Sequence, residues 1–170
     1  ETLFAYLQQL PADATPRKDH DIPWYLGFRI LNWFWKLLFF ERGPLVPDPA
    51  QSPEFNRGAY VAQALAHCGE CHTPRNIFGA VDESLHLAGN PHGPEDALVP
   101  NITPHDEHGV GLWSPADLVS YLTFGEMPDG DYAGGAMAEV IDAGLSNLTA
   151  DDAKALAAYL AALAPNPHSP

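Results

Sequence analysis

The chain has 170 residues and a formal charge of −14 at neutral pH, because 22 Asp and Glu outnumber 8 Lys and Arg. So acidic a surface repels the phosphates of nucleic acid, which excludes DNA or RNA as a partner, and it suits a protein partner with a basic docking patch. With 17 prolines and 14 glycines, and little alternation of apolar and polar residues, the chain favours short helices joined by long loops. We expect an all-α fold.

The first ten residues follow a helical period, and Pro11 closes the segment. The stretch 4–11 resembles 158–165 near the other end of the chain. This weak internal repeat suggests that residues 1–10 are the last helix of a preceding, similar domain. The alternative is coincidence between two amphipathic helices.

An aromatic segment over residues 24–40 follows a proline-containing linker and holds three of the four tryptophans. Its polar residues Arg29, Asn32 and Lys36 form one narrow stripe on an otherwise apolar helix. A membrane span needs about 20 apolar residues, so this segment is short for one. It either packs against the domain that follows, or is an exposed anchor for a partner subunit or the membrane interface.

The next predicted helix covers about residues 54–67, with Ser52 as its N-cap and Pro53 at its first position. Gly58 lies inside this helix, where a glycine costs about 1 kcal/mol relative to alanine. We expect the close approach of another helix to offset that cost.

The stretch Cys68-Gly69-Glu70-Cys71-His72 follows. On a helix, residues at i, i+3 and i+4 share one face. Two thiols can then bond to the edge of a porphyrin while the imidazole reaches its iron. The pattern therefore indicates the covalent attachment site of one c-type haem.

Other uses of two cysteines fit less well. A thioredoxin-like dithiol has no need of an adjoining histidine and lies in a βαβ pattern. A zinc site of three or four thiolates is excluded, because these are the only two cysteines. Covalent haem attachment in bacteria takes place outside the cytoplasmic membrane, so we expect a periplasmic protein. The chain starts without Met, inside a helical pattern, as a mature protein or a fragment does.

Several residues after the motif are candidates for haem contacts. A ligating histidine usually donates its other ring N–H to a carbonyl or carboxylate, and the Pro74 carbonyl is close in sequence to His72. Arg75 is a candidate ion-pair partner for a haem propionate. Asn101 and Trp113, in the long loop that follows, each carry an N–H that could reach a propionate.

Two further helices are predicted by their start signals. One runs from Ser114, with Pro115 and Asp117 behind it, to about residue 124, where Gly125 stops it. The other starts after Thr149 and ends before Pro165. The stretch from 125 to about 147 is rich in Gly and Pro and is predicted as a loop.

The second axial ligand decides the chemistry, because a Met sulfur raises the reduction potential and suits electron transfer. The two methionines are Met127 and Met137. Met137 is preferred because Gly134, Gly135 and Ala136 before it let the backbone approach a haem face. A histidine or an open position remains as the alternative.

The order of these features resembles a class I c-type cytochrome. More narrowly, four stretches resemble the haem domains of membrane-bound bacterial alcohol, gluconate and related sugar-acid dehydrogenases, namely residues 71–76, 100–104, 109–114 and 136–137. The cytochrome subunits of that family carry several such domains in tandem. This chain departs from them in having one haem motif, and in Ala138 where proline is common after the methionine.

The resemblance implies a cytochrome c-like haem domain over residues 51–166, after a helical lead segment and linker over 1–50. It implies that His72 and Met137 are the axial ligands and that Cys68 and Cys71 form thioethers. The domain would accept electrons from a dehydrogenase subunit or a neighbouring haem, and pass them to quinone or a downstream carrier, without substrate chemistry. Two alternatives are a haem enzyme or gas sensor with an open sixth site, and a structural or docking module.

Overall fold

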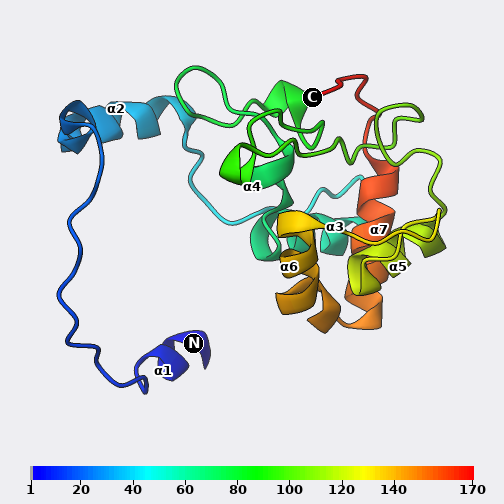
Figure 1. Cartoon of the computed structure of the whole chain (residues 1–170), viewed down its shortest axis with the longest axis horizontal. Coiled ribbons are helices and arrows are strands. Elements are labelled where there is room, and N and C mark those ends of the chain that lie inside the picture. Colours follow the sequence, from blue (N-terminus) through cyan, green and yellow to red (C-terminus); the bar gives the residue numbers. More distant parts are fainter. Residues whose placement is uncertain (1) are drawn as a thin grey trace. The chain divides into compact units, whose positions relative to one another are not determined.

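The computed structural model describes residues 2–170, which form two compact units, one ending at Arg42 and the other Gly43–Pro170 (Figure 1). The first unit contains α1 (Thr2–Leu7) and α2 (Arg29–Phe39). The helices of the second unit are α3 (Pro53–Tyr60), α4 (Cys68–His72), α5 (Pro115–Phe124), α6 (Gly135–Ala143) and α7 (Ala150–Ala162). Residues 2–170 contain isolated β-bridges but no strand. The predicted all-α fold is confirmed.

Short helical turns complete the backbone. Four are 3₁₀ turns, at Trp24–Gly27, Glu83–Leu85, Pro94–Asp96 and Leu145–Asn147, and one is a π-helical turn, at Val61–Leu65.

The first unit contains both helices predicted there. The helix predicted over 1–10 is found at α1, although Glu1 lies outside the described residues. The aromatic segment is divided at Phe28, whose extended backbone separates a 3₁₀ turn from α2. No residue of α2 is buried. No helix within residues 2–170 is long and apolar enough to cross a lipid bilayer.

Three helices of the second unit, α3, α5 and α7, begin where their caps predict. The Ser52 hydroxyl accepts the Phe55 N–H at 3.0 Å at the start of α3. Ser114 and Asp117 form a reciprocal capping box, with N···O distances of 2.8 and 3.2 Å, at the start of α5. Such caps satisfy N–H groups that have no partner inside the helix. Gly125 ends α5 in the left-handed conformation, with φ of 76°.

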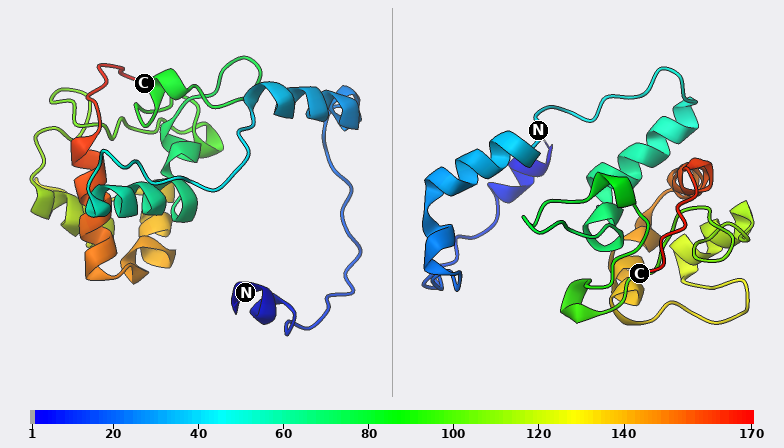
Figure 2. Two further views of the ribbon diagram at one scale, coloured as in Figure 1. Left: turned by 180° about the vertical axis from the view of Figure 1, so that it is seen from behind. Right: turned by 90° about the horizontal axis from the view of Figure 1, so that it is seen from above.

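The core of the second unit is built where α3 crosses α7 (Figures 1 and 2). A Cβ added to Gly58 would lie 2.0 Å from the Ala155 carbonyl oxygen and 2.6 Å from the Tyr159 Cβ. The predicted close approach of another helix at Gly58 is therefore confirmed. The large buried side chains of this core include Val61, Leu118, Leu122, Ile141, Leu145, Leu156 and Leu160.

The predicted loop over residues 125–147 is wrong in its second half, which forms α6. Gly134 and Gly135 suggested irregular backbone, but the residues from Ala136 to Glu139 are strong helix formers. Ile141 then buries one face of α6 in the core. Met137 consequently lies in the first turn of a helix rather than in a loop.

An ion pair joins α3 to α7 beside this crossing, and it predicts an acid-sensitive stability. Arg57 Nε and Nη2 lie 2.6 and 2.9 Å from the two carboxylate oxygens of Asp152. The hydrogen bond from Arg57 lowers the pKa of Asp152 below the ordinary 3.8. Because the folded pKa is below the unfolded one, the stabilisation is complete above the unfolded pKa and is lost as the pH falls through the folded pKa.

We therefore expect Asp152→Asn to destabilise the protein at pH 7 and to do so less at pH 3, which lies below the ordinary pKa of 3.8. Urea unfolding at both pH values, followed by circular dichroism, measures the difference. Asp151→Asn is the matched control, since Asp151 lies in the same helical turn and has no ion pair within residues 2–170. An equal loss of stability at both pH values would contradict the prediction.

Candidate haem attachment site

The chain enters the Cys-x-x-Cys-His segment through two irregular features. After α3 the backbone forms the π-helical turn Val61–Leu65, with the Ala66 N–H donating to the Val61 carbonyl at 2.8 Å. Turns of this kind inside helices occur frequently at functional sites. His67 then adopts a left-handed conformation, with φ of 52° and ψ of 39°. This residue gives α4 a separate start from the preceding helix.

Helix α4 holds the three residues that the motif predicts on one face. Cys68 and Cys71 are half-buried free thiols, and His72 is only 8% exposed. Burial raises the pKa of the Cys68 thiol to about 11, so it is protonated at neutral pH. The predicted helical spacing of Cys68, Cys71 and His72 is thus present.

The His72 ring is held by a residue far along the chain. Its Nδ1 lies 2.8 Å from the Pro100 carbonyl oxygen. Because a carbonyl only accepts, Nδ1 carries the proton and Nε2 keeps the lone pair that a metal ligand needs. Burial lowers the pKa of His72, and the hydrogen bond to Pro100 partly opposes this.

The prediction that the Pro74 carbonyl accepts this hydrogen bond is wrong. The Pro74 carbonyl instead accepts the Asp82 N–H at 2.9 Å. The chain turns back on itself after the motif, with Arg75 paired to Val81 in a β-bridge, and this turn uses the Pro74 oxygen. The acceptor that reaches His72 comes from the next loop.

That loop is hydrogen-bonded to His72 itself and to the residue that directly follows it in the chain. The fully buried Thr73 hydroxyl accepts the Leu87 N–H at 2.9 Å, and the His72 carbonyl accepts the Gly89 N–H at 2.8 Å. The sequence pattern did not identify Thr73 and Pro100 as parts of the site. The only local signal was the position of Thr73 directly after the motif, and no local pattern points to Pro100.

Three residues predicted to contact haem propionates have the following positions. Arg75 pairs with Glu70 and donates to the Gly79 carbonyl at 2.9 Å. The two amide N–H groups of Asn101 are donated to the segment 166–168. The Trp113 ring packs edge-on against Tyr121, at 5.3 Å between centroids, and its indole N–H has no hydrogen bond to a described residue. The propionate contacts stay predictions.

The two methionines differ in what they contact. Both are half-buried. Met137 packs against the core cluster that Cys68 and Trp113 also border. Met127 is not among the residues that border this cluster, and its backbone N–H closes a turn by donating to the Asp131 carbonyl at 2.8 Å.

The chemistry of the donor set tests whether the site fits a haem. Two thiols lie one turn apart on α4. The buried His72 ring uses Nδ1 for the Pro100 carbonyl, and its Nε2 has no hydrogen bond to any of residues 2–170. Two thiols and one available imidazole nitrogen on a single helical face suit a porphyrin that carries a metal. The residues therefore fit a haem.

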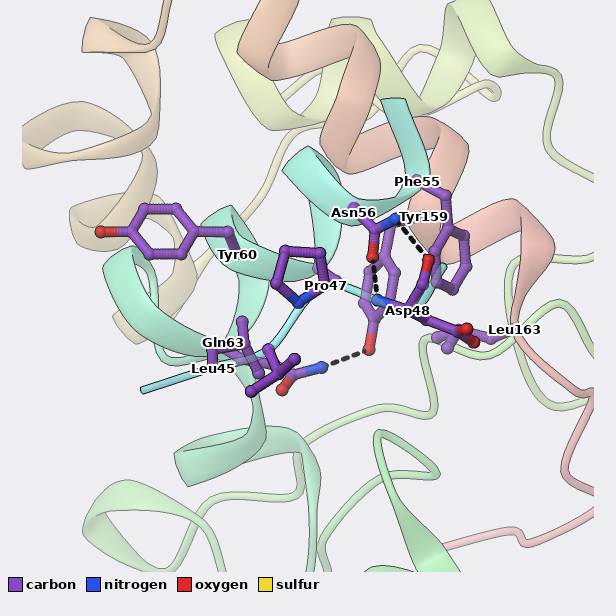
Figure 3. A pocket seen from close by; sticks show the side chains of 11 residues that line it. Leu45, Pro47, Asp48, Phe55, Asn56, Tyr60, Gln63, Tyr159 and Leu163 are labelled. Atoms are coloured by element: carbon purple, nitrogen blue, oxygen red, sulfur yellow. Dashed lines mark hydrogen bonds between the residues drawn. The ribbon is translucent and has the colours of Figure 1, made fainter. Parts of the chain in front are cut away.

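A pocket of about 260 Å³ lies elsewhere, between the segment 45–48, α3 and the end of α7 (Figure 3). The Asn56 side chain holds the segment by accepting the Asp48 N–H at 2.7 Å and donating to the Asp48 carbonyl at 2.8 Å. The Tyr159 hydroxyl faces it and accepts a hydrogen bond from Gln63 at 3.1 Å. None of the attachment residues lines this pocket.

The helical fold and the Cys-Cys-His site together define a cytochrome c-like domain. No family model matches the chain. It is 42% identical over 93% of its length to a dihaem c-type cytochrome of Cereibacter sphaeroides. It is 39% identical over 94% of its length to the fructose dehydrogenase cytochrome subunit of Gluconobacter japonicus, and 35% identical over 96% to the gluconate 2-dehydrogenase cytochrome c subunit of Pantoea cypripedii.

The chain spans 51% of the length of the first of these relatives, and 33% and 38% of the other two. The chain is also 33% identical, over 99% of its length, to the cytochrome c subunit of the alcohol dehydrogenase (quinone) of Komagataeibacter europaeus, and it spans 37% of the length of that subunit. The similarity to cytochrome c subunits of dehydrogenases over most of the chain confirms the resemblance that the sequence predicted.

Proposed function

We propose that this domain is an electron-transfer relay with one covalently attached haem c. The observation that carries the proposal is the buried His72 ring on the same helix as two thiols. Its Nδ1 donates to the Pro100 carbonyl at 2.8 Å, and its Nε2 has no hydrogen bond to any of residues 2–170. When bound, the haem supplies an iron that alternates between the ferric and ferrous states. Two cysteines suffice for one such attachment, and a dihaem relative is about twice as long as the chain.

Different residues would hold different parts of the haem. Cys68 and Cys71 would form the thioethers, and His72 and Met137 would ligate the iron. Met137 is supported over Met127 by its place beside the core that Cys68 borders. The Trp113 indole N–H, free of partners within residues 2–170, and Arg75 are the proposed donors to the propionates.

The proposed electron path runs from a dehydrogenase subunit or a neighbouring haem to quinone or a downstream carrier, on the periplasmic side of the membrane. The relatives are cytochrome subunits of dehydrogenases, which supports a dehydrogenase subunit as the donor. The second unit holds 17 of the 22 acidic residues and only 3 of the 8 basic ones. A partner with a basic patch would dock on it. The domain itself performs no substrate chemistry.

Covalent attachment is tested with the two cysteines after expression with haem maturation machinery. We expect the wild-type haem to stay with the polypeptide through acidified-acetone extraction and a denaturing gel. The Cys68→Ala/Cys71→Ala variant should lose all of its haem to the organic phase, because axial bonds alone do not survive unfolding. A colourless wild-type polypeptide, or a double variant that keeps its haem, would overturn the proposal.

Carbon monoxide distinguishes the relay from a haem enzyme or gas sensor. A ferrous iron held on both sides should bind carbon monoxide slowly and incompletely at neutral pH. Rapid and complete binding by the wild-type protein would favour the open-site alternative.

A further inference from the structure

The segment 166–168, after α7, returns to the loop that holds His72 (Figure 1). Asn101 is 3% exposed, and its side chain is fully used. Its two amide N–H groups are donated to the carbonyls of Asn166, at 2.9 Å, and His168, at 3.0 Å. Its Oδ1 accepts both the backbone N–H and the hydroxyl of Thr103, at 2.8 and 2.7 Å.

Thr103 is the second attachment point of this segment. It is 1% exposed, and its hydroxyl oxygen accepts the Asn166 N–H at 3.1 Å. Asn101, Thr103, Asn166 and His168 thus form a closed hydrogen-bond network, which we call the tail clamp. Buried networks of this kind fix backbone positions, because breaking one member leaves another buried group without a partner.

The tail clamp acts next to the carbonyl that holds His72. Asn101 directly follows Pro100 in the chain, so the fixed asparagine fixes the peptide unit that carries the Pro100 oxygen. On the other side, Val99 exchanges two hydrogen bonds of 2.9 Å with Asn90. A Cβ on Gly89 would lie 2.8 Å from the backbone nitrogen of Asn101. The backbone at Asn101 therefore packs closely against Gly89. The Pro100 carbonyl is therefore held from both sides.

We propose that the tail clamp positions the axial histidine, by keeping the Pro100 carbonyl on Nδ1 of His72. This inference rests on the proposed function, in which Nε2 of His72 binds the iron. A ligating histidine that donates its other N–H to a carbonyl is a more basic ligand. A more basic ligand favours the ferric state, so the clamp lowers the reduction potential. Asn101 and Thr103 are then positioning residues, and segment 166–168 is part of the haem site.

The test uses the haem-loaded protein with Asn101→Ala and Thr103→Val. Both variants should exchange the His72 Nδ1 proton with solvent at least about tenfold faster in the ferrous protein, measured by NMR with ¹⁵N-labelled histidine, since about 1.4 kcal/mol of lost protection corresponds to a factor of ten. Both should also raise the reduction potential. Thr103→Ser, which keeps the hydroxyl, should restore the wild-type values.

Asn147→Ala is the matched control, because the exposed side chain of Asn147 donates within residues 2–170 only to the Ala143 carbonyl, at 3.5 Å, four residues before it. If Asn101→Ala does not accumulate, the nearly isosteric Thr103→Val decides the question. Wild-type exchange and potential in a folded Thr103→Val protein would overturn the inference. Failure of the proposed function has a different signature, which is a wild-type protein without bound haem or without a haem-shifted His72 signal.

Discussion

Gly58→Ala is expected to lower the free energy of unfolding by about 3 kcal/mol or more, at the upper end of the range for overpacked cores. The added Cβ would lie 2.0 Å from the Ala155 carbonyl oxygen and 2.6 Å from the Tyr159 Cβ. Neither is the flexible end of a side chain, so α3 and α7 would have to move apart. Because α3 leads through the π-helical turn into α4, the strain should also reduce haem incorporation.

The measurement is urea unfolding, with the yield of haem-loaded protein as a second readout. Gly27→Ala is the control, since no atom of the described residues lies within 4 Å of the corresponding Cβ and the φ of Gly27 is not positive. The control should unfold like the wild type. Wild-type stability in Gly58→Ala would mean that α3 and α7 do not cross this closely.

Met137→Ala is expected to abolish the far-red absorption of the ferric protein, which arises from a sulfur ligand on iron. The reduction potential should fall, because thioether ligation raises it. The ferrous protein should then bind carbon monoxide rapidly, since one axial position is open. Met137 is half-buried beside the core that Cys68 borders, so a modest loss of stability should accompany these changes.

Met127→Leu is the matched control, because it removes the other methionine sulfur and keeps an apolar side chain of similar size. Its far-red band should be unchanged. A band that disappears in Met127→Leu and survives in Met137→Ala would assign the ligand to Met127. A band absent from the wild type would exclude methionine altogether.

The starts of α3, α5 and α7 could be predicted because their causes are local. Ser52, Ser114 and Thr149 each accept an N–H from three residues along, which depends only on nearby sequence. Helix α6 was missed because Gly134 and Gly135 outweighed the helix formers behind them. The burial of Ile141 of α6 against elements distant in the sequence cannot be predicted from the local pattern.

The candidate site also has a local part, which the sequence predicts, and a long-range part, which it does not. The spacing of Cys68, Cys71 and His72 by itself predicts their shared helical face, since three residues make almost one turn. The partner of His72 Nδ1 was assigned to Pro74, two residues away, but is Pro100, at a separation of 28 residues. Two prolines with equivalent carbonyls cannot be distinguished until the loops have folded.

The sequence alone predicted the class of this protein, because a covalent haem site needs its thiols and imidazole within one helical turn and because α3, α5 and α7 carry their own caps. Only the tertiary structure decided how the site is supported: which carbonyl receives the His72 proton, which helix requires Gly58, and where Asn101 directs its amide. The reason is that hydrogen bonds and close helix crossings join residues far apart in the chain. Their partners are selected by the packing of the whole domain, which no local pattern encodes.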